Sequence, residues 1–207
     1  MMPPVCPPAI VTPTIEVVRA DPSVAMDTGL SIAALTHKAG HDGEHVEVRG
    51  LTVNNLQRQI RLHMEGRPLP ENPDLACYRL TGIEVTILPI TTVYVASEYP
   101  AGSCAYKAVL QHENRHVVSF LDALWRYRAQ VRDTVWATVW RIGVQGPFDE
   151  ADANQFMTTL RQALDAALLP YDENLLARDR GLQEKIDNSG EYANVARQIE
   201  KCLRRGR

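Results

Sequence analysis

Five consecutive residues, His112-Glu113-Asn114-Arg115-His116, have the types and spacing of a metal-binding motif, H-E-x-x-H. On a helix, positions i and i+4 lie about 40° apart and roughly 6 Å along the axis, so both imidazoles can reach one ion. Glu113 lies about 100° round from His112, where its carboxylate can contact a water on that ion. The spacing predicts a zinc site with His112 and His116 as ligands and Glu113 as the general base.

The residues around the motif predict that it lies on a helix directly after a sheet. Residues 83–87 and 92–96 are rich in β-branched side chains, as strands are. Ser103 follows a Pro-Ala-Gly break and is a suitable N-cap. Beyond it, apolar residues recur at three- and four-residue spacing, as on a helix with one buried face; these are Tyr106, Val109, Leu110, Val117, Phe120, Leu121 and Leu124. The alternative is an ordinary helix whose histidines are exposed or hydrogen-bonded in the core.

This arrangement resembles the zincin metallopeptidases. The segment from Gly102-Ser103-Cys104 to His116, with the later Ile186-Asp187, Glu191-Tyr192 and Cys202, is similar to uncharacterised bacterial families of predicted secreted zinc proteases. The resemblance runs from the last strand of the sheet to the end of the chain. Arg115 stands where some related families have glycine. The resemblance implies the same roles for the two histidines and Glu113, and a peptide or protein substrate.

A catalytic zinc usually takes three protein ligands and a water, so a third ligand is needed. In metzincin-like patterns it stands ten residues after the first histidine, which here is Asp122. The glycine that bends the helix in those patterns is replaced by Ser119. On an unbroken helix, Asp122 would lie about 9 Å beyond His116 and miss the metal.

In gluzincins a glutamate from a later helix completes the site, and Glu191 is the residue that we expect in this role. Asp187 remains an alternative ligand. Glu191 also fits a capping box with Asn188, a structural role at the start of a helix. Tyr192, Arg115 and Tyr127 are candidate donors to a developing oxyanion.

A second group of histidines, His37, His41 and His45, has four-residue spacing. Gly40 and Gly43 lie between them and favour a loop over a helix. We interpret this group as a solvated polar loop, with an adventitious or regulatory metal site as the alternative.

The length of 207 residues and the composition, 45% hydrophobic and 23% charged, are typical of one globular domain. A net charge of −3 argues against a nucleic-acid-binding protein. No stretch approaches the length of a membrane span. The start of the chain lacks the charged and apolar regions of a signal peptide, so the protein is either cytosolic or a mature exported form.

Four cysteines are spread along the chain without a C-x-x-C pair, which argues against a cysteine zinc site. An even count suits two disulfides in an oxidising compartment. Of three pairings we favour Cys6–Cys77 and Cys104–Cys202, because each stays within one half of the chain. Four buried free thiols are the alternative. We therefore expect a periplasmic or secreted protein, with a cytoplasmic one as the alternative.

Hydrophobic periodicity predicts a single α+β domain: a strand-rich half, residues 1–103, with a mostly antiparallel sheet, then a helical half, residues 104–207, that carries the metal site. The resemblance implies that this domain is zincin-like. Predicted strands begin at Ile15 and cover 45–49, 58–64, 78–87 and 90–97, with a helix at 28–37 and a loop at 66–74. Predicted helices cover 104–132, 150–169, 171–186 and 191–203.

These features favour a zinc-dependent hydrolase, a peptidase exported from a bacterium, which holds its substrate by strand addition near Val93. A peptidoglycan hydrolase is a variant of this hypothesis. Two other hypotheses are a non-catalytic, metal-stabilised envelope or binding protein on a zincin scaffold, and a cytosolic domain with a fortuitous motif.

Overall fold

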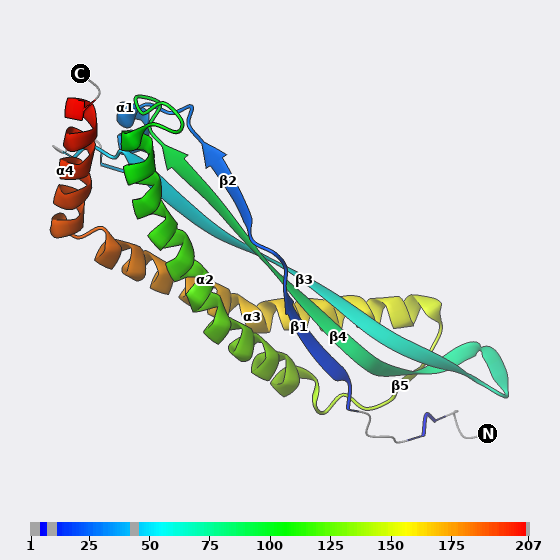
Figure 1. Cartoon of the computed structure of the whole chain (residues 1–207). Helices are drawn as coiled ribbons and strands as arrows, with labels where there is room; N and C mark the ends of the chain where they lie inside the picture. The colour runs from blue at the N-terminus through cyan, green and yellow to red at the C-terminus, as the bar shows by residue number, and fades with distance from the viewer. Residues whose placement is uncertain (1–4, 8–11, 42–45, 206–207) are drawn as a thin grey trace. The chain divides into compact units, whose positions relative to one another are not determined.

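The computed structural model describes residues 5–7, 12–41 and 46–205, and it is a mixed α/β fold in which a sheet is followed by helices (Figure 1). The elements in chain order are β1 (Thr14–Arg19), β2 (Ser23–Asp27), α1 (Ile32–Lys38), β3 (Gly50–Leu69), β4 (Asn72–Val95), α2 (Cys104–Val139), β5 (Gln145–Phe148), α3 (Glu150–Ile186) and α4 (Ser189–Arg205). Among the described residues, no helix is both long and apolar enough to cross a membrane.

Strand β4 is the centre of the sheet, because β1, β2, β3 and β5 all pair with it. β1 pairs in parallel with residues 82–87 of β4, and β2 pairs in parallel with residues 90–94. β5 is antiparallel to β4. β3 also runs antiparallel, because a two-residue connection joins it to β4. The sheet is therefore mixed, whereas the sequence predicted a mostly antiparallel one; α1 and β3 supply the long connection that a parallel pair needs.

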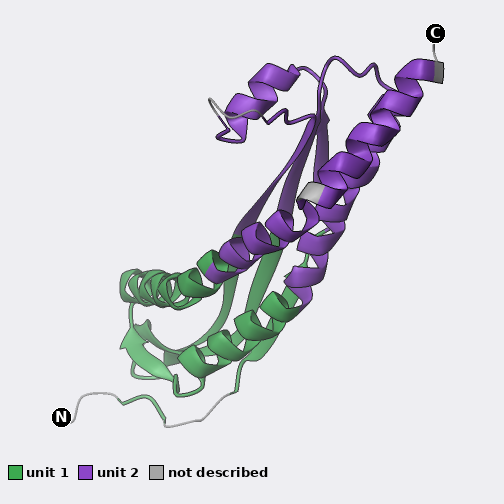
Figure 2. Ribbon diagram, turned by 90° about the vertical axis from the view of Figure 1, so that its left-hand side faces the viewer, with its two compact units in different colours: residues 1–20, 58–88, 126–173 green, residues 21–57, 89–125, 174–207 purple. Residues whose placement is uncertain are grey.

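The chain forms two compact units (Figure 2). Unit 1 comprises the described parts of residues 1–20, 58–88 and 126–173, and unit 2 comprises those of residues 21–57, 89–125 and 174–207. β3, β4, α2 and α3 each contribute residues to both units.

In unit 1, alternate residues of β4 are buried together with one stripe of α2. Arg128 of α2 donates from Nε to the Val17 carbonyl of β1 over 2.8 Å. A buried Arg58 binds Asp172, Asp165 and Tyr127. The Cys6–Cys77 disulfide lies in this unit.

In unit 2, α1, the end of β4, the first turns of α2 and α4 share one core. The buried members are Leu35, Val48, Val95, Ala96, Tyr99, Ala105, Ala108, Val109 and Ile199. The Cys104–Cys202 disulfide ties the first turn of α2 to α4, and these helices lie side by side at the end of Figure 1 nearest the C-terminus. Both predicted cysteine pairs are confirmed, and none of the four cysteines is free.

The predicted strands are shorter than the strands in the structure. The predicted loop at 66–74 is largely strand, because β3 extends to Leu69 and β4 begins at Asn72. Residues 46–49 are not a strand, and His45 lies outside the described residues. β2 was missed because four of its five residues are exposed, so no hydrophobic alternation marks it. α1 begins later than predicted, with Ser31 as its N-cap.

The helix predictions ended one helix too early and split another that is continuous. α2 runs on to Val139, because Val131, Val135 and Val139 continue its buried stripe. α3 contains Pro170 in its interior, and a proline at such a position costs a helix about 3 kcal/mol. Burial of Leu164, Leu168 and Leu175 offsets this cost, so packing overrides the local signal.

Candidate metal centre

Helix α2 presents the motif on its buried face. Ser103 caps the helix as predicted, accepting a hydrogen bond from the Tyr106 amide over 3.1 Å. His112, Glu113 and His116 are only 6%, 3% and 2% exposed. The two histidines are therefore not surface groups, and three buried ionisable side chains stand within two turns of one helix.

The functional atoms of these side chains converge within unit 2. His112 Nε2 and His116 Nε2 are 3.2 Å apart. One ligand atom from each of His112, Glu113 and His116 lies within 4.8 Å of the others, so the group could hold a metal ion.

Asp187 completes a triangle with the two imidazoles. Its Oδ1 lies 2.9 Å from His112 Nε2 and 3.0 Å from His116 Nε2. Ligand atoms bonded to a tetrahedral zinc at roughly 2.0–2.1 Å are about 3.3 Å apart. The three atoms are therefore spaced almost as the ligands of one small cation would be.

The connection between α3 and α4 positions Asp187. Its amide donates to the Gln183 carbonyl over 2.8 Å, which extends α3 by one residue. Asn188 then caps α4 by accepting from the Glu191 amide over 3.2 Å. Burial alone would raise the pKa of Asp187, but hydrogen bonds from His112 and His116 outweigh it and lower the pKa to about 2. The carboxylate is held ionised.

The structure brings Asp187 to the two histidines, and it places Glu191 on Arg115. Arg115 Nη2 donates to Glu191 Oε2 over 2.8 Å, and this hydrogen bond lowers the pKa of Glu191. Asp122 is exposed, one turn after Val118 on an open face of the unbroken α2.

Arg115 also fixes the tautomer of His112. Its Nη2 lies 2.6 Å from His112 Nδ1, and a guanidinium can only donate, so Nδ1 is the acceptor here. A cation bound at Nε2 would require the other tautomer, in which Nδ1 carries the proton, so Arg115 would have to give up this hydrogen bond.

His116 differs from His112 in its second nitrogen. His116 Nδ1 is buried, and the structure gives it no hydrogen-bond partner among the described residues. Burial lowers the pKa of His116, but the hydrogen bond and charge of Asp187, with the charge of Glu113, raise it above its ordinary value.

Strand β3 holds Glu113 in place. Thr52 Oγ1 donates to Glu113 Oε2 over 2.8 Å. The backbone of Gly50 approaches so closely that a Cβ there would stand 2.4 Å from Glu113 Oε1 and 2.5 Å from Val109 Cγ1. Burial raises the pKa of Glu113 despite the histidines and Thr52, which lower it. The sequence did not identify Gly50 or Thr52 as part of the site. The two residues are separated by Leu51, so on a strand both face the same side of the sheet, and this spacing is the signal that could have linked them.

Of the predicted oxyanion donors, Arg115 contacts His112 directly, and Tyr192 lies beside the same imidazole. The ring centroid of Tyr192 is 6.0 Å from that of His112. Burial, then the charges of Asp187 and Glu113, raise the pKa of Tyr192 to about 12, so its hydroxyl remains a donor. Tyr127 belongs to unit 1, where its hydroxyl donates to Asp172.

Among the described residues, potential metal ligands gather in one cluster of three or more, the one around His112, Glu113 and His116. His37 lies in α1 and His41 follows it, while His45 falls outside the described residues.

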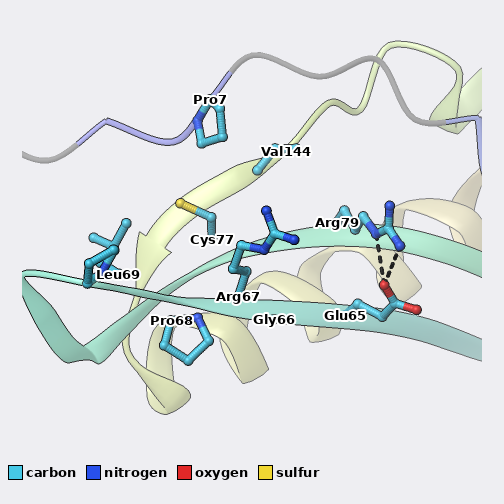
Figure 3. Close-up of a pocket in the computed structure, with 10 residues that line it drawn as sticks. Pro7, Glu65, Gly66, Arg67, Pro68, Leu69, Cys77, Arg79 and Val144 are labelled. Atoms are coloured by element: carbon cyan, nitrogen blue, oxygen red, sulfur yellow. Dashed lines mark hydrogen bonds and ion pairs between the residues drawn. The ribbon is translucent and has the colours of Figure 1, made fainter.

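In unit 1 the β3–β4 hairpin forms a cavity of ≈ 460 Å³ (Figure 3). Arg79 pairs with Glu65 at its wall, and Arg67, three prolines and Cys77 also line it. This cavity offers a binding surface but no metal-ligating or nucleophilic cluster among its lining residues.

No protein-family model, curated protein or solved structure matches this chain. The chemistry of the centre therefore rests on its own residues.

Replacing Gly50 by alanine should destabilise unit 2, because the new Cβ would overlap both Glu113 and the buried Val109. We expect the free energy of unfolding to fall by about 1–3 kcal/mol, the usual cost of overpacking. The control is Gly181→Ala in α3, where a Cβ meets no described heavy atom within 4 Å. That change should stabilise by roughly 0.5–1 kcal/mol. Urea unfolding measures both, and a Gly50→Ala midpoint equal to wild type would contradict the close packing.

Proposed function

We propose that the protein is a zinc-dependent hydrolase, a peptidase, in which His112, His116 and Asp187 hold the metal and Glu113 is the general base. The observation that carries the proposal is the convergence of Asp187 Oδ1 on both imidazole Nε2 atoms beside a buried carboxylate. The zincin resemblance of the motif supports the same conclusion.

The donor set supports zinc. Two imidazoles and one carboxylate form a typical catalytic zinc set that leaves a position for water. Other divalent metals accept the same ligands. A zinc hydrolase also uses a carboxylate that does not ligate the metal but accepts a proton from water. Glu113 is such a group, because Thr52 holds it and its position on α2 differs from that of the histidines.

A zinc ion in this centre would lower the pKa of a water molecule toward 7. Glu113 is suited to take the proton of that water, because burial raises its own pKa and makes it a stronger base. The same carboxyl can then pass the proton to the leaving amine. Tyr192 keeps its hydroxyl proton and can donate to a developing oxyanion.

The route of the substrate differs from our expectation. Val93 is fully buried and pairs with Met26 of β2, so β4 has no free edge there for strand addition. A small cleft of ≈ 120 Å³ lies beside His112 between α2 and α4, lined by Gln111, Arg115 and Glu191 among others. We propose this cleft as the approach to the centre, and an oxidising compartment, periplasmic or extracellular, because of the two disulfides.

The second candidate is a metal-stabilised binding or envelope protein without catalysis. One observation favours it: the motif residues are at most 6% exposed, which restricts access for a substrate. Metal binding is common to both candidates, so turnover separates them.

The ligand assignment can be tested by comparing Asp187→Asn with Glu191→Gln. We expect Asp187→Asn to weaken zinc binding by more than the about 10–100-fold that outer residues contribute, because it removes a direct ligand. Glu191→Gln should stay within that range, and His116→Ala should lose the metal. Chelator competition gives the affinities. If Glu191→Gln loses zinc while Asp187→Asn keeps it, Glu191 is the ligand.

Glu113→Gln tests catalysis. The amide keeps the size and the hydrogen bond from Thr52 but cannot accept a proton. Zinc occupancy should be unchanged, while hydrolysis of a casein or peptide-library substrate falls by about 10²-fold or more. Thr52→Val, which only loosens the carboxylate, should lose less. Equal hydrolysis by Glu113→Gln and wild type would refute the mechanism; zinc binding without turnover by the wild type would favour the structural candidate.

A further inference from the structure

All three tryptophans of the protein lie on α2 or directly after it, and all three are exposed. Trp136 and Trp140 belong to unit 1, where they are 44% and 50% exposed. The Trp140 amide donates to the Trp136 carbonyl over 3.0 Å, so the helical turn continues to Trp140. Residues four apart on a helix are neighbours, so the two indoles lie on one side of it. Tryptophan is highly buried in most proteins, and two neighbouring exposed indoles therefore point to a contact surface.

The core of unit 1 does not use these two indoles. Val131, Val135 and Val139 form the buried stripe of this part of α2, and each is 0% exposed. Trp136 and Trp140 each lie about 100° round the helix from the valine that directly precedes them. The segment therefore has a valine side that packs in the protein and a tryptophan side that is left for a partner.

The same segment is basic, although the protein as a whole is acidic. Residues 126–141 contain four arginines and one aspartate, a net charge of +3, whereas the net charge of the chain is −3. The arginines are all exposed, and they are Arg126, Arg128, Arg132 and Arg141. A basic helical segment that also exposes tryptophan is typical of proteins that bind membrane surfaces.

Most of this positive charge has no carboxylate partner within the protein. Asp133 pairs with Arg132 over 3.3 Å, and both side chains are exposed. Arg128 donates to a backbone carbonyl of β1, which is a neutral group. The guanidinium of Arg141 lies 4.4 Å from the centroid of the Trp140 ring. The segment is therefore available to a partner of opposite charge.

The charge argues against a second copy of the chain as the occupant of this face. An interface around a twofold axis uses the same patch on both copies, so it would bring together two segments that each carry a net charge of +3. Like charges that meet across an interface repel one another.

An acidic protein would satisfy the arginines, but this face lacks the apolar core of a protein interface. Within residues 126–141, Trp136 and Trp140 are the two large apolar side chains that are exposed, and their exposed neighbours are alanine, glutamine, arginine and aspartate. A lipid surface requires no such core. The indole ring has an apolar body and a polar N–H, which suits the boundary between hydrocarbon and headgroups.

We propose that residues 126–141 bind the surface of an anionic lipid bilayer. The rings of Trp136 and Trp140 enter the headgroup layer, and the arginines contact the lipid phosphates. The contact is shallow, because the valine side of α2 remains packed in unit 1. This inference goes beyond the proposed hydrolase and does not depend on its metal centre.

The test compares vesicles that contain phosphatidylglycerol with vesicles of phosphatidylcholine alone. In the Trp125→Phe variant, Trp136 and Trp140 are the only tryptophans, so the fluorescence emission reports on this face alone. We expect the anionic vesicles to shift this emission to the blue and to sediment with the protein. Binding to the neutral vesicles should be about tenfold weaker or worse. Raising the salt concentration to about 0.5 M should release most of the bound protein.

Two double variants separate the contribution of the rings from that of the charges. Trp136→Ala with Trp140→Ala removes both indoles. Arg126→Gln with Arg132→Gln removes two charges, and Arg128 is left in place because it holds β1. Each double variant should bind anionic vesicles about tenfold more weakly than wild type, or worse, in the sedimentation measurement.

The matched controls change exposed side chains elsewhere. Leu169→Ala removes an exposed apolar side chain of unit 1 that lies on α3. Arg178→Gln with Arg180→Gln removes two exposed charges from α3. Both controls should bind the vesicles as wild type does, and urea unfolding of every variant shows whether the fold is kept.

Absence of binding to anionic vesicles would overturn the inference, and an emission shift with polyglutamate in their place would assign the face to an acidic protein. Binding that leaves the Trp125→Phe emission unchanged, or that both double variants retain, would also overturn it. So would a blue shift that grows with protein concentration in the absence of lipid, which would assign the face to a second copy. Zinc content and hydrolysis bear only on the proposed function, and vesicle binding bears only on this surface.

Discussion

Burial of three ionisable side chains on one face of α2 is the constraint on which the rest of the structure depends. His112, Glu113 and His116 are almost fully removed from solvent, and a buried ionisable group is costly unless it is paired or coordinates a metal. Asp187 and Thr52 meet this requirement from α3 and β3. Asp187 reaches the histidines from the two-residue connection between α3 and α4.

Strand β3 binds two buried carboxylates, one on α2 and one on α3. Thr52 and Asn54 project from the same face of β3; Thr52 holds the Glu113 carboxylate, and Asn54 holds Asp179. Gly50 lets the strand approach α2 closely enough for these contacts. On the other side, the Cys104–Cys202 disulfide fixes α4, which carries Glu191 and Tyr192, against the start of α2. The centre is therefore held by the sheet, α3 and α4 together.

The sequence predicted those features that depend on local spacing. The i, i+4 histidines, the Ser103 cap and the strand before it are all readable over a few residues, and each was confirmed as structure. Asp187 and Glu191 are four residues apart and both carry a carboxylate, so only their tertiary contacts separate them: Asp187 meets the two histidines, and Glu191 meets Arg115. Pro170 predicted a helix end, yet the buried leucines on both sides keep α3 continuous. Thr52 and Asp179 could not be predicted, because each acquires its partner only when β3 and α3 meet α2 or one another.

Zinc K-edge X-ray absorption of protein purified without added zinc or chelator tests the central claim most directly. We expect about one zinc per chain, with a shell of nitrogen and oxygen ligands at roughly 2.0–2.2 Å and scattering from two imidazole rings. Replacing His116 by alanine should remove that signal. A sulfur shell at about 2.3 Å, or a folded chain that carries no zinc, would contradict a centre built on His112, His116 and Asp187.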